Sequence, residues 1–426
     1  MTKNRKSRAV HRHCVTLNDA GTIYGKEFRY MINTQKVAED ILWIGASDRR
    51  ISRFENLFPL TNGVSYNSYL LFDEKTVLFD TADSTVAGQF FENLTASMEG
   101  RKLDYLVILH MEPDHCAQIA RVVSLFPDVT LAGSMKALQF AEQFFPELKN
   151  VPREVLKEGS VLNTGKHNIS FVAAPMVHWP EVLLAYDDVN KAVFSADAFG
   201  TWGAVDGSIF ADEHDYEKEY LDDSRRYYAN IVGKYGPQVQ GVLKKAAKLD
   251  IQMLLPLHGP VWRKDLGYLL DLYQKWSTYT PETEDITIVY GTLYGNTASA
   301  AMAASAAIRE KTGKTVHVFD VSETDVSYLI DAVWRCGKIV LFCPTYNNGI
   351  YPPMEAFLTD LAALGVQNRT FALAENGTWA PVTGKLMRAK LEGLKNCQVL
   401  DTVLSFKSAL HDEAALDAFA SAVAEA

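Results

Sequence analysis

The stretch LHMEPDHCAQ, residues 109–118, places two histidines and two carboxylates within six positions. It closes an apolar run that is typical of a buried β-strand. Alternate side chains of an extended segment point to the same side, so His110, Glu112 and Asp114 are predicted to converge. His115 follows on the turn into the next helix. A solvated loop or a lone core histidine does not account for four potential ligands this close together, so the stretch indicates a metal site at a strand end.

Three later segments share one pattern, an apolar run that ends in a single potential ligand. They are residues 171–178, 191–197 and 251–258, which end in His178, Asp197 and His258. Neighbouring strands of a layered α/β fold end at one rim, so we expect these three side chains to meet the cluster of residues 110–115 there.

The combined donor set contains imidazoles and carboxylates but no thiolate, and it exceeds what one tetrahedral ion uses. The set therefore predicts a pair of metal ions. An aspartate such as Asp197 suits the position between them, because a carboxylate has two oxygens and offsets the repulsion between two cations. Two irons fit this donor set best, and manganese and zinc are lesser possibilities.

The sequence before residue 276 is rich in short strands. Residues 40–44, 66–72 and 76–80 are predicted strands, and residues 86–98 form a predicted amphipathic helix. Strands and helices then alternate, which places this part of the chain in the α/β class.

A polar stretch with one proline, residues 277–285, is predicted to be a linker. The apolar strands 286–290, 338–342 and 370–374 follow it, each leading into a Gly/Asn/Thr loop and a helical pattern. This alternation is typical of a doubly wound parallel sheet of the flavodoxin-like kind.

Three loops of this second part suit a flavin mononucleotide (FMN). The first opens a helix, so its hydroxyls and backbone N–H groups form an anion cradle for a phosphate. The other two follow the next two strands, where amides and aromatic rings would border an isoalloxazine ring. The predicted FMN-binding residues are Thr292, Leu293, Tyr294, Gly295, Asn296, Thr297, Pro344, Thr345, Tyr346, Asn347, Asn348, Gly349, Asn376, Gly377, Thr378 and Trp379. A Gly-x-Gly-x-x-Gly fingerprint for NAD is absent from the sequence.

The composition limits the partners. The net charge is -10, so nucleic acid is not an expected partner. The longest apolar runs are far too short to cross a membrane, and no secretion signal follows the basic start. The five cysteines include no Cys-x-x-Cys pair. We therefore predict a cytoplasmic protein with reduced thiols.

Three regions are predicted along the chain. Residues 1–34 are a disordered tail or an over-long start, in which Met31 is an alternative initiator. Residues 35–280 form the metal domain, and residues 281–426 form the FMN-binding domain.

The run His-x-Glu-x-Asp-His at 110–115, with its three downstream ligands, resembles the metallo-β-lactamase-like domain of the flavodiiron proteins, or A-type flavoproteins. The contexts 175–180 and 195–200 are similar as well. Hydrolytic members of the wider superfamily carry His-x-His-x-Asp-His, so Glu112 is the discriminating departure. The added negative charge stabilises higher oxidation states and suits iron redox chemistry. The resemblance implies an αββα metallo-β-lactamase-like domain followed by a flavodoxin-like domain.

The resemblance also implies roles for individual residues. His110, Glu112 and His178 would hold one iron, Asp114 and His258 the other, and Asp197 would bridge the two. His115 matches a position that is a ligand in some relatives and turned away in others, so its role stays open.

The activity implied by the resemblance is an oxidoreductase that passes electrons through FMN to a diiron site, where O₂ is reduced to water, NO to N₂O, or both. A head-to-tail homodimer, or a dimer of such dimers, is implied, with each FMN facing the partner's irons. The sequence contains no rubredoxin-like cysteine pairs, so an external electron donor is expected, rubredoxin or a related reductase.

Two alternatives remain at this point. A zinc-dependent hydrolase fused to a flavodoxin-like domain keeps the fold, but Glu112 argues against it. An electron carrier with a metal-free first domain is the second alternative, and the intact ligand set argues against that.

Overall fold

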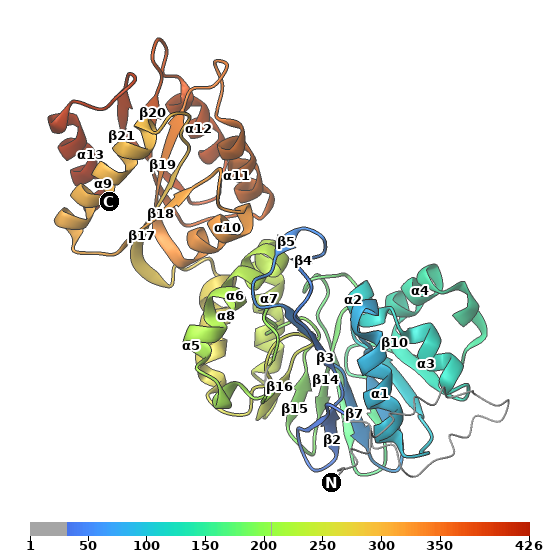
Figure 1. Cartoon of the computed structure of the whole chain (residues 1–426). Helices are drawn as coiled ribbons and strands as arrows, with labels where there is room; N and C mark the ends of the chain where they lie inside the picture. Colours follow the sequence, from blue (N-terminus) through green and yellow to red (C-terminus); the bar gives the residue numbers. More distant parts are fainter. Residues whose placement is uncertain (1–31, 206) are drawn as a thin grey trace, which may run out of the picture. The chain divides into compact units, whose positions relative to one another are not determined.

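The computed structural model describes residues 32–205 and 207–426 (Figure 1). The predicted tail therefore lies almost wholly outside the described residues, as does the alternative start at Met31. Within the described ranges, no helix is long and apolar enough to cross a membrane.

The first sheet has seven strands in the spatial order β1-β2-β7-β8-β9-β10-β11. The last four strands in this order run parallel to one another, and the other neighbours are antiparallel. The strands are β1 (Gln35–Lys36), β2 (Ile41–Trp43), β7 (Tyr69–Phe72), β8 (Thr76–Phe79), β9 (Tyr105–Ile108), β10 (Thr130–Ser134) and β11 (Arg153–Leu156).

The second sheet has five strands in sequence order, from β12 to β16. They are β12 (Val161–Asn163), β13 (Asn168–Ala173), β14 (Leu183–Asp187), β15 (Ala192–Phe194) and β16 (Met253–Leu255). Only β15 and β16 pair in parallel, with Phe194 opposite Leu255. Their chains leave the sheet side by side, which brings the segments after Phe194 and Leu255 to the same rim.

The two sheets pack face to face, and their apolar side chains share one core. The rings of Phe79 and Phe194, one from each sheet, stack with centroids 3.8 Å apart. Two groups of helices flank the pair of sheets on opposite sides (Figure 1). They are α1 (Ala87–Met98), α2 (Pro113–Cys116), α3 (Ile119–Leu125) and α4 (Met135–Phe144) on one side, and α5 (Tyr216–Glu219), α6 (Leu221–Tyr227), α7 (Gly236–Ala246) and α8 (Leu266–Ser277) on the other. The predicted αββα arrangement is confirmed.

The third sheet is parallel throughout, in the order β18-β17-β19-β20-β21. Its strands are β17 (Thr283–Tyr290), β18 (Val316–Asp320), β19 (Cys336–Pro344), β20 (Thr370–Asn376) and β21 (Gln398–Phe406). Helices cover both faces: α9 (Asn296–Thr312) and α13 (Glu413–Glu425) on one, and α10 (Val326–Arg335), α11 (Pro352–Ala363) and α12 (Thr383–Leu391) on the other (Figure 1). Counted within this sheet, the order is 2-1-3-4-5, which is the flavodoxin-like order, so this prediction is confirmed as well.

Two short ribbons complete the first part of the chain. One pairs β3 (Ala46–Asp48) with β6 (Val64–Tyr66), and the other is the hairpin of β4 (Arg53–Phe54) and β5 (Phe58–Pro59). The predicted strand 66–72 is thus two strands, β6 and β7, that join different sheets. The break lies at Asn67, whose backbone and side chain bind the segment 256–259 instead of a neighbouring strand.

Candidate functional site

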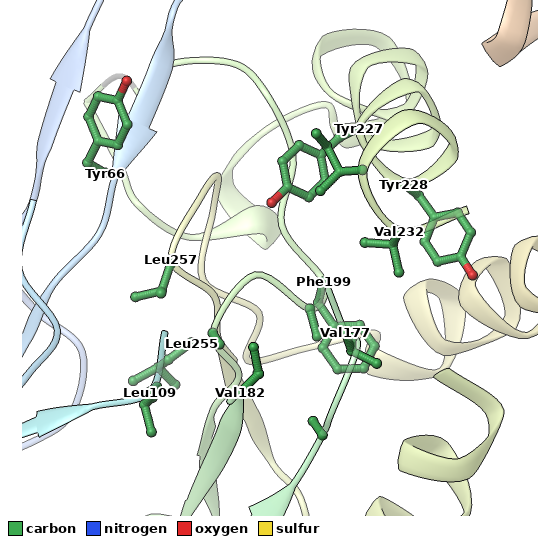
Figure 2. Close-up of a cluster of buried hydrophobic side chains, with 14 of the residues drawn as sticks. Tyr66, Leu109, Val177, Val182, Phe199, Tyr227, Tyr228, Val232, Leu255 and Leu257 are labelled. Carbon is green, nitrogen blue, oxygen red and sulfur yellow. The ribbon is translucent and has the colours of Figure 1, made fainter. Parts of the chain in front are cut away.

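The predicted metal ligands lie at strand ends, as the sequence pattern indicates. His110 follows β9, and Asp197 and His258 each come three residues after the paired residues Phe194 and Leu255. His178 lies in the loop between β13 and β14. Figure 2 shows a cluster of buried apolar side chains that includes Leu109, Val182, Leu255 and Leu257; Leu109 and Leu257 directly precede His110 and His258 in the chain.

The stretch 109–118 is not extended as far as predicted. Pro113 begins α2, so the backbone is extended only up to Glu112, and Asp114 and His115 lie on a helical turn. Because of this turn, the two halves of the stretch face different groups of partners. His110 and Glu112 belong to one group, and Asp114 and His115 belong to the other.

The first group consists of His110, Glu112, His178 and Asp197, whose potential ligand atoms all lie within 4.8 Å of one another. Oε2 of Glu112 lies 3.0 Å from Nε2 of His178 and 3.3 Å from Nε2 of His110. Oδ2 of Asp197 lies 3.2 Å and 3.4 Å from the same two nitrogens. Four donor atoms therefore surround one point.

The second group consists of Asp114, His115 and His258, again within 4.8 Å of one another. Nε2 of His115 lies 3.1 Å from Nε2 of His258, and Oδ2 of Asp114 lies 3.2 Å from Nε2 of His258. Asp197 turns its other oxygen, Oδ1, towards this group, 3.0 Å from Nε2 of His115. Its carboxylate therefore lies between the two groups with one oxygen on each.

In His110 and in His258, a hydrogen bond from Nδ1 leaves Nε2 as the ring nitrogen that can bind a cation. Nδ1 of His110 donates to Oε1 of Glu181 (2.8 Å), which also accepts the backbone N–H of Met111 (2.9 Å). Nδ1 of His258 donates to the carbonyl of Ser65 (2.8 Å). When these rings are neutral, Nε2 of each carries a lone pair that points into the cluster.

The charged side chains of the cluster shift one another's pKa values. Burial opposes protonation of the imidazoles, but the carboxylates outweigh it: Asp114 and Asp197 raise the pKa of His115 to about 9, and Asp197 and Glu112 raise that of His178 to about 9. Burial likewise opposes ionisation of Asp197, yet the charges of His115 and His110 hold its pKa well below the usual value. The cluster thus combines anionic carboxylates with imidazoles of raised pKa. A bound cation suits such a cluster, because it would replace the protons on the imidazoles.

Buried polar atoms without hydrogen-bond partners also indicate that the cluster suits bound cations. Among the described residues, Oδ1 of Asp114 and Nδ1 of His115 are buried without a hydrogen-bond partner. Groups of this kind are costly to bury unless something binds them. Seven nitrogen- or oxygen-donating side chains without sulfur fit a pair of hard or borderline cations such as iron.

Three residues of the site were not predicted from the sequence. Glu181 and Ser65 are not predicted ligands, but they accept hydrogen bonds from His110 and His258, respectively. The carboxyl of Glu55 lies beside that of Glu112, and burial together with the neighbouring carboxyl of Glu112 raises the pKa of Glu55 to about 8. Glu181 carries a signal, a lone acid in the mainly apolar stretch after His178, whereas the sequence holds none for Ser65.

A cavity of about 670 Å³ lies at the carboxyl edge of the third sheet, where β17, β19 and β20 end. Its lining includes every predicted FMN-binding residue except Gly295 and Gly349. Ala380 and Ser408 line it as well and were not predicted.

The cavity offers both anion-binding and amide-binding groups. Gly295 caps α9 with φ 94° and no side-chain cap, which leaves backbone N–H groups at the helix start. Thr292 folds the loop by accepting the backbone N–H of Gly295 (3.1 Å). Oδ1 of Asn376 is buried and has no hydrogen-bond partner among the described residues, while its amide nitrogen donates to Thr297. A phosphate at the helix start and a ring N–H at Asn376 fit these groups.

Comparison with known proteins agrees with this two-part architecture. Residues 64–259 match the family described as ODP family beta lactamase, and residues 288–399 match the flavodoxin family. The anaerobic nitric oxide reductase flavorubredoxin of Escherichia coli O1:K1 / APEC is 30% identical over 353 residues, 81% of this chain and 72% of that protein. The flavorubredoxin of Aliivibrio salmonicida is 32% identical over 338 residues, and this chain spans 66% of its length.

Solved structures give the same result. The rubredoxin oxygen:oxidoreductase of Desulfovibrio gigas has a TM-score of 0.85 at 26% identity, covering 92% of this chain and 98% of that one. The flavodiiron protein of Giardia intestinalis has a TM-score of 0.87 at 24% identity, covering 93% and 96%. Fold and site define a protein that joins a two-cation centre to a flavin-binding module. The chain belongs to the flavodiiron protein family.

Proposed function

We propose that this protein is an FMN-dependent diiron oxidoreductase that reduces O₂ to water, NO to N₂O, or both. The observation that carries the proposal is the carboxylate of Asp197, which presents one oxygen to each of two groups of metal-binding side chains. The same chain contains a flavodoxin module with a cavity at its cofactor edge.

The proposed ligands follow the two groups. His110, Glu112 and His178 would hold one iron, Asp114 and His258 would hold the other, and Asp197 would offer one oxygen to each. We assign His115 to the second iron, because its Nε2 points at Oδ1 of Asp197 and at Nε2 of His258.

Two adjacent irons, when bound, supply electrons to a diatomic gas, and FMN supplies the remaining electrons. The residues of the chain would hold the irons in neighbouring sites, since Asp197 reaches both groups. Glu112 adds an anionic donor where hydrolytic relatives carry histidine. This charge favours iron in its higher oxidation states, which argues against the alternative, a zinc-dependent hydrolase.

The electron donor and the assembly belong to the same proposal. The donor is rubredoxin or a related reductase, in keeping with the names of the relatives from D. gigas and E. coli. Aromatic residues at the rim of the flavin cavity are exposed, Tyr294 by 95% and Trp379 by 82%. Exposed aromatic residues of this kind suit a protein interface, and we propose a head-to-tail homodimer, or a dimer of dimers, in which they face the partner's diiron site.

We also keep the domain division at residues 35–280 and 281–426, and a cytoplasmic location, as proposals. The division is supported by the end of α8 at Ser277 and the start of β17 at Thr283. The location is supported by the four free cysteines in the described part of the chain.

The first test combines cofactor analysis with gas consumption. Purified protein reconstituted anaerobically with ferrous iron should contain FMN and two irons per chain, and it should consume O₂ or NO when reduced rubredoxin is supplied. Asp197→Asn should lose most of its iron and activity while keeping FMN, because the bridge loses its charge. Asp188→Asn is the control, since Asp188 lies on a surface turn and hydrogen-bonds to Asn168. Zinc in place of iron, or full activity of Asp197→Asn, would contradict the proposal.

A further inference from the structure

The hairpin Arg53–Pro59 forms one wall of the metal cluster. The ring of Phe54 meets the ring of His258 edge-on with centroids 5.4 Å apart, and Phe54 is 3% exposed. The carboxyl of Glu55 lies beside that of Glu112, a member of the other ligand group. The hairpin therefore contacts the cluster at both groups.

This hairpin is not held by a larger sheet. Within residues 32–205 and 207–426, its strands β4 and β5 pair only with each other, in a two-stranded ribbon. An isolated hairpin of this size is at best marginally stable in water. Side-chain contacts must therefore determine where Phe54 and Glu55 lie.

Arg226, on α6, supplies such contacts from a fully buried position, with 1% of its surface exposed. Its Nη2 donates to the carbonyl of Pro59, at the end of the hairpin. Its guanidinium group lies 4.5 Å from the ring centroid of Trp202, and that ring in turn packs on Phe54 and Phe58 with centroids 5.9 Å and 5.2 Å away. Arg226 thus holds the hairpin through the backbone and through an aromatic ring.

The other side of the same guanidinium is fixed by the flavodoxin-like part of the chain. Nε donates to Oγ of Ser327 (3.2 Å), and the ring of Tyr328 lies 3.9 Å away on α10. Nη1 donates to Asp223 (2.9 Å), one turn earlier on α6. A planar guanidinium suits this position because it stacks on rings while its edge donates hydrogen bonds.

We propose that Arg226 is a positioning residue that holds the hairpin Arg53–Pro59 against the diiron site and anchors it to α10 of the flavodoxin-like part. In the described part of the chain, its hydrogen bonds and ring contacts go to residues other than the predicted ligands, so it acts through Pro59 and Trp202. Phe54 of the hairpin packs on His258, which is fully buried, so loosening of the hairpin would open this side of the cluster to solvent. The role in protecting iron rests on the proposed function, whereas the role in ordering the hairpin does not.

Arg225 provides a matched comparison within the molecule. It is equally buried (1% exposed) and also joins α6 to the later part of the chain, by hydrogen bonds to Glu282 (2.6 Å) and Asp331 (2.9 Å). Within the described residues, its hydrogen bonds go to these carboxylates and to Asp222, and not to the hairpin. Replacing either arginine by methionine removes a buried charge. Of the two, Arg226 is the one that contacts Pro59 and Trp202 in the described part of the chain.

The test compares Arg226→Met with Arg225→Met in the full chain. Hydrogen–deuterium exchange of the hairpin should be roughly tenfold faster in Arg226→Met than in Arg225→Met, because the opening of a local element sets its exchange rate. The amides of Leu57 and Leu60 report it, since they donate to Phe54 and Ser52. If Arg226→Met does not fold, Tyr328→Leu serves in its place, because it removes one stacking surface from a half-buried position.

A second readout concerns the metal site. In iron-loaded protein, the release of iron to a chelator should be several-fold faster in Arg226→Met than in Arg225→Met. Equal hairpin exchange in the two variants would overturn the positioning role. Faster exchange with equal iron release would overturn the protective role alone. The exchange measurement needs no metal, so it still decides the positioning role if the protein proves not to bind iron.

Discussion

At the scale of single residues, the two histidines with fixed tautomers have different supports. His110 donates to the carboxylate of Glu181, whereas His258 donates to the neutral carbonyl of Ser65. A carboxylate behind an imidazole raises the basicity of the ring and orients it. The first ligand group is therefore the more electron-rich of the two.

Replacing Glu181 tests this difference. Glu181→Gln keeps an oxygen acceptor for His110 but removes the charge, and we expect a loss of roughly tenfold to hundredfold in metal affinity. Competition with a chelator of known affinity measures the effect. Glu158→Gln, at an exposed position, is the control. Unchanged affinity in Glu181→Gln would show that the hydrogen bond to His110 matters without the charge of Glu181.

His167 gives a prediction for the pH dependence of stability. The ring is 1% exposed and lies between two carboxylates, with Nδ1 2.8 Å from Asp187 and Nε2 2.8 Å from Asp40. Burial alone would lower the pKa of His167, but the hydrogen bond and charge of Asp187, followed by the charge of Asp40, raise it above 6.5. Because the pKa is raised on folding, the stabilisation is complete below pH 6.5 and is lost as the pH rises through the folded-state pKa.

The variant His167→Gln should therefore reduce the free energy of unfolding at about pH 6 by roughly 2 kcal/mol, and by less at about pH 9. Urea unfolding of both proteins at the two pH values measures the difference. A reduction that is the same at both values would mean that His167 is neutral in the folded protein.

At the scale of elements, the sequence predicts strands well where one apolar run forms one strand. The runs 338–342 and 370–374 lie within β19 and β20, and the predicted helix 86–98 coincides with α1 to within one residue. The prediction fails at 66–72, because the apolar pattern does not reveal that Asn67 leaves the sheet to bind the segment carrying His258. The turn into the next helix was predicted at His115 but begins at Pro113, since a strand pattern alone does not show where the backbone stops being extended.

Gly377 directly follows β20 and lines the proposed FMN cavity. A Cβ atom there would lie 2.7 Å from the backbone oxygen of Ala380, so Gly377→Ala must displace the loop that carries Trp379. We expect FMN affinity to fall by roughly tenfold, as overpacked sites lose their geometry. Titration of apoprotein with FMN, followed by flavin fluorescence, measures it. Gly393→Ala is the control, because its Cβ would lie 3.5 Å from its nearest neighbour, an ordinary contact. Equal affinity of the two variants would contradict a role for this loop.

At the scale of the whole molecule, the two parts of the chain have separate sequence signals. The ligand pattern of residues 110–258 and the loops after the strands of the third sheet were each recognisable on their own. The contacts that join the two parts were not, because Arg225, Arg226, Ser327 and Asp331 resemble ordinary surface residues in a helical pattern. Burial of two adjacent arginines depends on partners more than fifty residues away, and no local pattern reveals them.

The measurement that tests the central claim most directly is the oxidation of reduced protein by each gas in a single mixing experiment. Iron-loaded, FMN-containing protein is reduced anaerobically and mixed with O₂ or with NO in separate stopped-flow runs, while the flavin absorbance is followed. We expect rapid flavin re-oxidation by at least one gas, and slow re-oxidation by that gas in His110→Ala with its FMN intact. Slow re-oxidation by both gases in the iron-loaded protein, or equal rates in His110→Ala, would contradict the assignment of gas reduction to the diiron site.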